Sequence, residues 1–238
     1  MLYKCAGIAE NQNMRSSTEQ TDSRHSSAAR RIIGNLTGRY PDLMIPSAEA
    51  PRLVFPSGVV ELDSLFTHRG IPYGQLIELT GAESSGKTRL LHTLLASLTL
   101  HGRGMWFDPQ GMFCPEAALS AGIDLRKLLA VSSTSTDKGL RVAEILLEQR
   151  ACLFVVLDLT REKQVLPIPL LHRLRLKTLQ AKGLTIFLTE SQPDGRSIIP
   201  ASMTSLKLLV ERISGKAYRI TVTKSRICKE GEELRVSL

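Results

Sequence analysis

Four residues between positions 81 and 88 have the types and spacing suited to holding a phosphate chain. Gly81, Gly86, Lys87 and Thr88 fit the pattern G-x-x-x-x-G-K-[ST] within the stretch LTGAESSGKTRLL. The glycines permit a tight turn in which successive N–H groups point into a concave nest, and a helix beginning at Lys87 adds partial positive charge. Because the pattern directly follows the strand-like run QLIELT, it predicts a site for ATP.

The side chains of this loop divide the binding chemistry between them. Lys87 is expected between the terminal phosphates, and the hydroxyl of Thr88 is expected on a Mg²⁺ ion. Asp158 ends the apolar run CLFVVLD, where it either holds a metal-bound water or only caps the next helix; the phosphate loop favours the metal role. The expected loop contacts to ATP are Gly81, Glu83, Ser84, Ser85, Gly86, Lys87, Thr88 and Arg89, with Thr88 and Asp158 at the metal.

Alternating strand-like and helical segments must position these residues. This alternation predicts an α/β fold with a twisted, mainly parallel sheet and helices on both faces. The expected parallel strands are residues 75–80, 104–108, 152–158 and 184–189, with helices starting at Lys87 and near Glu116 and Leu170. Residues 205–214, 216–227 and 233–238 follow one another with only short Gly-containing turns, which predicts antiparallel strands that extend the sheet.

The chain divides into three parts by composition. Residues 1–27 are polar and poor in aromatics, which predicts a disordered tail. Residues 28–50 carry Ala29, Ile32, Ile33 and Leu36 at helical spacing, which predicts an amphipathic arm that docks either on the chain's own core or on another subunit. Residues 51–238 are expected to form the ATP-binding core.

Overall composition limits the protein's surroundings. The 238 residues are 42% hydrophobic with a net charge of +8, so the surface field attracts polyanions such as nucleic acid. The four cysteines lie far apart in the sequence. We find neither a signal-like apolar segment near the amino terminus nor a run of roughly 20 apolar residues. These features predict a cytoplasmic protein that does not enter a membrane.

The loop and its flanking segments resemble the RecA recombinase family. The segments FPSGVVELDSLF, GIPYGQLIELTGAESSGKT and FDPQGMFCPEAALSAGID are similar to consecutive parts of the RecA core, and ITVTKSRI is similar to its late basic strand. The similarity extends roughly from Arg30 to Leu238, with Ala82 where a proline is usual. It implies a RecA-type P-loop ATPase core and filaments in which ATP lies between subunits.

Two departures from the family pattern concern catalysis. Gln110 replaces the glutamate that activates the attacking water, and an amide cannot take up that proton. Glu190 replaces the glutamine that senses the terminal phosphate. The two residue types are therefore exchanged, so the chain either lacks an efficient base or uses Glu190 as a displaced one. Whether it is an ATP hydrolase stays open from the sequence.

Other positions concern the nucleotide base and the subunit contact. The family's adenine-stacking tyrosine falls on Ala117 and its nearby aspartate on Cys114, which predicts weakened base recognition. Lys224 and Arg226 match two lysines that reach a neighbouring subunit's phosphates in the family. They either retain that role and favour self-association, or are simply a solvated strand face.

The expected DNA-binding regions are shorter than in the family. The first becomes a basic helix with Leu170, Leu171, Leu174 and Thr178 inward. The cations on its outward face either meet phosphates or solvate the helix; they include His172, Arg173, Arg175, Lys177 and Lys182. The second loop lacks aromatic residues for stacking, although Arg196 remains a candidate phosphate contact.

Two functions fit this pattern. The first is an ATP-binding protein of bacterial DNA damage tolerance, with weak or absent hydrolysis, similar to ImuA-type accessory proteins of SOS translesion mutagenesis that work with RecA-like and polymerase partners. The second is an active DNA-dependent ATPase that forms recombinase filaments on single-stranded DNA. DNA stimulation of ATP turnover separates them.

Overall fold

The sheet that carries the phosphate loop is mixed, and its central strands are parallel. In the computed structural model, which describes residues 54–191 and 197–238, its strand order is β10-β9-β8-β3-β7-β6-β4-β5. β1 and β2 form a separate small antiparallel sheet. The strands are β1 (Val54–Phe55), β2 (Ile71–Pro72), β3 (Gln75–Thr80), β4 (Gly104–Phe107), β5 (Leu128–Val131), β6 (Phe154–Asp158), β7 (Leu184–Leu188), β8 (Leu206–Ser214), β9 (Ala217–Ser225) and β10 (Glu233–Ser237).

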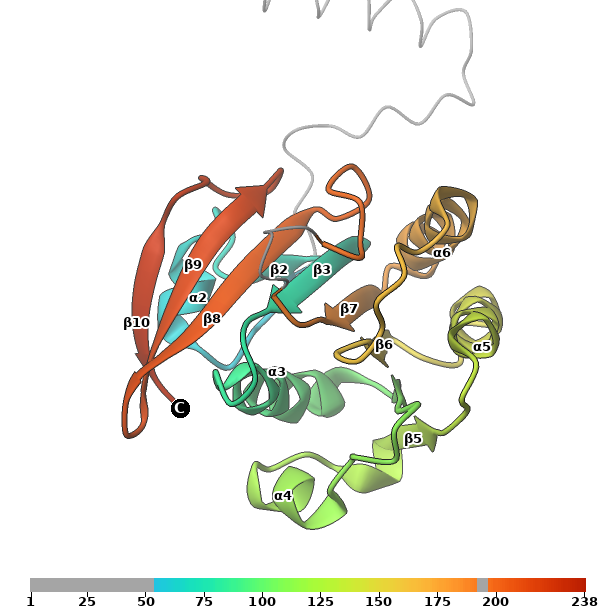
Figure 1. Ribbon diagram of the computed structural model, residues 1–238, viewed down its shortest axis with the longest axis horizontal. Coiled ribbons are helices and arrows are strands. Elements are labelled where there is room, and N and C mark those ends of the chain that lie inside the picture. The colour runs from blue at the N-terminus through green and yellow to red at the C-terminus, as the bar shows by residue number, and fades with distance from the viewer. Residues whose placement is uncertain (1–53, 192–196) are drawn as a thin grey trace, which may run out of the picture. The chain divides into compact units, whose positions relative to one another are not determined.

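Helices cover the two faces of the central strands (Figure 1). One apolar cluster joins the sheet to α2, α3 and α4, and a second joins the opposite face to α5 and α6. The helices are α2 (Val60–Ser64), α3 (Lys87–His101), α4 (Pro115–Ser120), α5 (Thr136–Glu148) and α6 (Ile168–Ala181), with a 3₁₀ turn, η1 (Leu125–Lys127). The predicted α/β class, with helices on both faces of a mainly parallel sheet, is confirmed.

The burial of each strand follows its place in the sheet. Every residue of β7 is buried, as expected for a parallel strand covered on both faces. In β8 the buried residues alternate instead, with Leu206, Leu208 and Val210 in the cluster beneath α3. The opposite side chains, Lys207 and Leu209, are half-buried, because no helix among the described residues covers that face.

The carboxyl-terminal strands extend the main sheet as expected. β8 pairs antiparallel with β9, and β9 with β10, as predicted. β8 in turn pairs parallel with β3, and this pair joins the antiparallel carboxyl-terminal strands to the parallel part of the sheet. The connection from β7 is long enough to return β8 to the same direction as β3, as a parallel crossover requires.

Other expectations concern the ends of the chain and the membrane. The predicted tail at residues 1–27 and arm at residues 28–50 lie outside the described residues and stay predictions. No helix in the described part of the chain is long and apolar enough to cross a membrane.

Candidate functional site

A cleft of about 860 Å³ opens at the carboxyl ends of β3, β6 and β7, beside the start of α3. We call it the phosphate-loop cleft. Carboxyl ends of parallel strands are the usual place for ligands in open α/β sheets. Six residues predicted from the sequence line this cleft: Glu83, Ser84, Lys87, Thr88, Asp158 and Glu190. Arg89, also predicted to bind, is exposed and does not line it.

The two loop glycines are required by their surroundings. Gly86 has φ of 95°, and a Cβ there would lie 2.2 Å from the ring of Tyr218. A Cβ on Gly81 would lie 2.5 Å from the carbonyl oxygen of Val210 and equally close to the hydroxyl of Ser85. The loop therefore rests on β8 and β9, and its tight backbone leaves no space for larger residues.

Lys87 is buried at the base of the loop, with 7% of its surface exposed. Its ammonium group donates to the carbonyl oxygens of Gly81 at 3.1 Å and Ala82 at 2.9 Å. Burial lowers the pKa of Lys87, and the nearby carboxylates, first Glu190 and then Asp158, oppose this. A phosphate chain in the cleft would give this ammonium stronger acceptors than the loop carbonyls and would favour its charged form.

Asp158 enters the cleft from the end of β6. Its Oδ1 accepts hydrogen bonds from the backbone N–H of Thr160 at 3.2 Å and from the Thr160 hydroxyl at 2.8 Å. Burial raises the pKa of Asp158, those two hydrogen bonds oppose the rise, and Asp108 adds to it. Both hydrogen bonds from Thr160 go to Oδ1, which leaves Oδ2 without a hydrogen-bond donor among the described residues and suited to a metal-bound water.

The donor set suits Mg²⁺ held together with phosphate oxygens. Thr88 supplies a hydroxyl and Asp158 a carboxylate, which are hard oxygen ligands of the kind that Mg²⁺ prefers. Within residues 54–191 and 197–238, no three His, Cys, Asp or Glu side chains form a group that could hold a metal ion. These two residues would thus complete a metal site only with the ligand's own oxygens.

Gln110 and Glu190 differ in their relation to the cleft. Gln110 is exposed and is absent from the lining, whereas Glu190 is half-buried and borders the cleft. The carboxylate of Asp108 fixes the turn that carries Gln110, accepting from the N–H of Gln110 at 3.2 Å and from that of Phe113 at 2.7 Å. Of the two exchanged positions, only position 190 carries an acidic side chain, and it lies close to Lys87.

One end of the cleft has an aromatic wall that the sequence patterns do not predict. Trp106 packs against Phe113 with ring centroids 5.0 Å apart, and His92 approaches its edge at 5.7 Å. Ala117 and Cys114, the positions at which base recognition is expected to be weak, also line the cleft. His92 lies four residues after Thr88 on α3, so helical spacing offers the signal that would have identified it.

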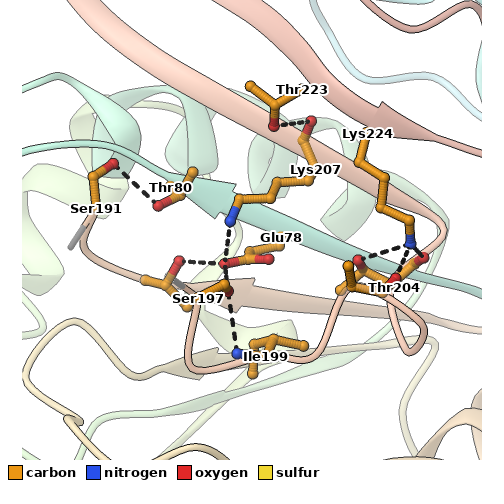
Figure 2. A network of polar contacts seen from close by, with 11 residues as sticks. Glu78, Thr80, Ser191, Ser197, Ile199, Thr204, Lys207, Thr223 and Lys224 are labelled. Atoms are coloured by element: carbon orange, nitrogen blue, oxygen red, sulfur yellow. Dashed lines mark hydrogen bonds and ion pairs between the residues drawn. The ribbon is translucent and has the colours of Figure 1, made fainter. Parts of the chain in front are cut away.

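A second cleft of about 940 Å³, which we call the strand cleft, lies over β8 and β9 and shares Glu83, Ser84 and Ser191 with the first. Lys224 borders it and donates to the carbonyl oxygens of Ala201 and Thr204 (Figure 2).

The two basic residues expected at a subunit contact are therefore engaged within their own chain. Arg226 lies just after the end of β9 and donates to the carbonyl oxygen of Ser202 at 2.9 Å. Burial lowers the pKa of Lys224, and the neighbouring Arg226 lowers it further. Both cations hold the segment that leads into β8, and neither lines the phosphate-loop cleft.

The predicted basic helix is present as α6, with Leu170, Leu171, Leu174 and Thr178 buried as expected. Two of its outward cations have acidic partners on α5. Arg173 lies 3.2 Å from Glu144, and Lys177 lies 2.6 Å from Glu148. Arg175 is half-buried, and Arg196 lies outside the described residues. The positive face of α6 is therefore partly neutralised by α5.

Comparison with known proteins agrees with this arrangement of loop, strand and cleft. The family profile described as the RecA N-terminal domain matches residues 46–162, which hold both the phosphate loop and Asp158. The chain belongs to the RecA family. The matched residues supply most of the walls of the phosphate-loop cleft, and the lining residues beyond the match are Lys163, Leu188, Glu190 and Ser191.

Individual relatives give the same relationship over a limited length. Protein RecA of Caldanaerobacter subterraneus subsp. tengcongensis is 34% identical over 106 residues, covering 44% of this chain and 31% of the relative. Protein RecA of Saccharopolyspora erythraea is 33% identical over 110 residues, covering 46% and 32% respectively. Protein RecA of Clavibacter michiganensis subsp. michiganensis is 34% identical over 110 residues, covering 46% and 30%. The chain thus spans about a third of the length of these relatives.

Proposed function

We propose that this protein is a RecA-like ATP-binding protein of bacterial DNA repair and damage tolerance that hydrolyses ATP weakly or not at all. In this role it binds ATP with Mg²⁺ in the phosphate-loop cleft and acts in the cytoplasm as an accessory to translesion mutagenesis. ATP then favours a conformation or an assembly, through self-association or a RecA-like or polymerase partner, more than it drives turnover.

One observation carries this proposal: the phosphate-binding residues converge on one cleft, while Gln110 lies outside it. Lys87, Thr88 and Asp158 line the cleft with the chemistry that a triphosphate and its metal need. Bound Mg²⁺ would supply charge neutralisation to the phosphates, and Lys87 would orient them. Gln110 is exposed and carries no group that takes a proton at neutral pH.

Direct measurement of binding and turnover tests the proposal. Wild type is expected to bind ATP with Mg²⁺, and K87A to bind at least tenfold more weakly because its phosphates lose a charged partner. Turnover is expected to stay close to background, with and without single-stranded DNA. R89A, a matched loss of a cation outside the cleft, serves as the control. Failure of the wild-type protein to bind ATP would refute the proposal.

Glu190 supports the second candidate, a DNA-dependent ATPase that forms filaments on single-stranded DNA. Its carboxylate borders the cleft and is close enough to affect the charge state of Lys87. A displaced base in this position predicts measurable turnover that E190Q abolishes. Steady-state assays of E190Q, Q110E and the double variant test it, and equally negligible rates in all three and in wild type would exclude it.

Contact with DNA belongs to both candidates but has limited support from α6. The net charge of +8 favours attraction to phosphates, whereas Arg173 and Lys177 already have acidic partners. We therefore place DNA contact on the remaining cations, among them Arg175, with Arg196 as a further candidate. Binding to labelled single-stranded DNA should weaken steeply with added salt if it is electrostatic.

A further inference from the structure

Glu78 is a buried carboxylate within the strand that leads to the phosphate loop, and only 1% of its surface is exposed. Three donors converge on the same oxygen, Oε1 (Figure 2). The hydroxyl of Thr189 donates at 2.9 Å, the hydroxyl of Ser197 donates at 2.6 Å, and the ammonium of Lys207 lies at 3.4 Å. Lys207 is also the residue directly opposite Glu78 across the β3–β8 pair.

This carboxylate is an unusual choice for its position. The other described residues of β3 after Gln75 are apolar or the small Thr80, as is typical of a strand covered on both faces. An ionised carboxylate in such a place costs several kcal/mol unless hydrogen bonds and a cation compensate it. The three donors supply that compensation, and a leucine here would fill the space without needing them.

The donors join segments that are distant in the sequence. Thr189 is 111 residues from Glu78, and Ser197 is 119 residues away. Thr189 follows β7 directly, and the next residue is Glu190, which borders the phosphate-loop cleft. Glu78 does not itself line that cleft, and among its three partners Thr189 is the one that directly precedes Glu190 in the chain.

Backbone hydrogen bonds also attach residues 189–191 to the end of β3 and to the phosphate loop. The N–H of Thr189 donates to the carbonyl oxygen of Leu79 at 2.9 Å. Two residues later, the N–H of Ser191 donates to the carbonyl oxygen of Gly81 at 3.1 Å. Glu190 lies between these two attachments, and successive residues of extended chain point to opposite sides. With Thr189 turned toward Glu78, Glu190 is directed away from it.

We propose that Glu78 is a positioning residue that sets the place of the Glu190 carboxylate in the phosphate-loop cleft by holding the Thr189 side chain. The inference rests on the proposed nucleotide site for its consequence, since Glu190 lines the cleft in which we propose that the triphosphate binds. Loss of the Glu78–Thr189 hydrogen bond lets residues 189–190 rotate, and the effect of the Glu190 charge on a triphosphate declines.

A double-mutant cycle tests this coupling. T189V removes the hydroxyl at nearly constant volume, and E78Q removes the charge of the acceptor, which weakens the hydrogen bond that Thr189 donates to it. In wild type, E190Q should change the ratio of the Kd values for ATP and ADP severalfold, because it removes a charge beside the terminal phosphate. In the T189V and E78Q backgrounds the same change should alter the ratio less than twofold.

The matched control is T185V, on the same strand. Thr185 is also fully buried, but its hydroxyl lies 2.7 Å from that of Thr178 on α6 instead of contacting Glu78. E190Q should act in the T185V background as it does in wild type. An equal E190Q effect in all four backgrounds would overturn the proposal, even if E78Q or T189V lowered stability.

A second measurement needs no nucleotide. In protein labelled with ¹³C at the glutamate carboxyl carbon, the Glu190 resonance can be assigned from its loss in E190Q. It should shift in T189V and E78Q and stay in place in T185V. An unmoved resonance in T189V rejects the positioning role whether or not ATP binds, whereas a shifted resonance together with absent ATP binding rejects only the proposed function.

Discussion

In the ligand-free protein, the negative charge of Asp158 should lower the free energy of unfolding. The proposed metal role gives a reason for the protein to keep this charge. D158N removes the charge and keeps the oxygen that matters locally, because both hydrogen bonds from Thr160 go to Oδ1. The amide group then occupies the side that faces the cleft. What changes is the cost of holding a negative charge in a partly buried site, less a small attraction to Lys87.

The magnitude follows from that difference. Burying a polar or charged group with incomplete compensation costs on the order of 1–3 kcal/mol in proteins, and the retained Thr160 bonds favour the low end. We expect D158N to raise the free energy of unfolding by about 1 kcal/mol at pH 7. For a domain of this size that corresponds to a rise in Tm of roughly 2–4 °C.

The pH dependence of the free energy of unfolding separately tests whether the Asp158 charge is destabilising. Burial raises the folded-state pKa of Asp158 above its ordinary value of 3.8, so the folded protein holds more protons than the unfolded chain between these two values. Wild-type stability therefore falls as pH rises through that window, and D158N lacks this contribution. The advantage of D158N should be full at pH 7 and should vanish as pH falls below about 4.

Urea unfolding at pH 7 and pH 4 measures these differences, with D137N on α5 as a control for loss of an exposed negative charge. Added ATP and Mg²⁺ should stabilise wild type in proportion to ligand affinity and stabilise D158N less. A D158N protein less stable than wild type at pH 7, or an advantage unchanged at pH 4, would refute the reasoning.

Three further predictions concern the loop, the cleft and α6. G86A should destabilise the fold by about 3 kcal/mol in urea unfolding, since it combines left-handed strain with a clash against Tyr218; a loss below 1 kcal/mol would contradict this. Trp106 is the only tryptophan in the sequence, so its emission should change on ATP binding, and an unchanged emission at saturation would place the ligand elsewhere. The double variant E144Q/E148Q frees two cations on α6 and should steepen the slope of log K for DNA binding against log salt concentration by roughly 1 per cation; an unchanged slope in anisotropy titrations would exclude α6 as a DNA-binding surface.

Local patterns predict the elements around the phosphate loop well. The strand, loop and helix around Lys87 follow from contiguous residues, so their signals do not depend on distant partners. Asp158 follows from the apolar strand that it ends. The inward face of α6 follows from helical spacing, because Leu170, Leu174 and Thr178 recur on one side and are buried. In each case one short segment contains the whole signal.

Elements whose environment is set by distant segments are harder to predict. No element was expected between residues 121 and 150, where β5 has two exposed residues at the sheet edge and α5 follows the capping residue Ser135. The parallel pairing of β8 depends on the path of a connection, which strand composition does not encode. Likewise, the in-chain partners of Lys224 and the donors gathered on Glu78 come from segments far along the chain.

The position of β3 inside the sheet bears on the order in which the protein can fold during synthesis. Its two neighbours are β7 and β8, which both follow residue 162, whereas β4, β5 and β6 pair among themselves. A nascent chain that has reached residue 162 holds the loop sequence but has no adjacent strand to fix it. β3 can gain both neighbours only after β8 has left the ribosome, so a product terminated before β7 would carry the motif without the site.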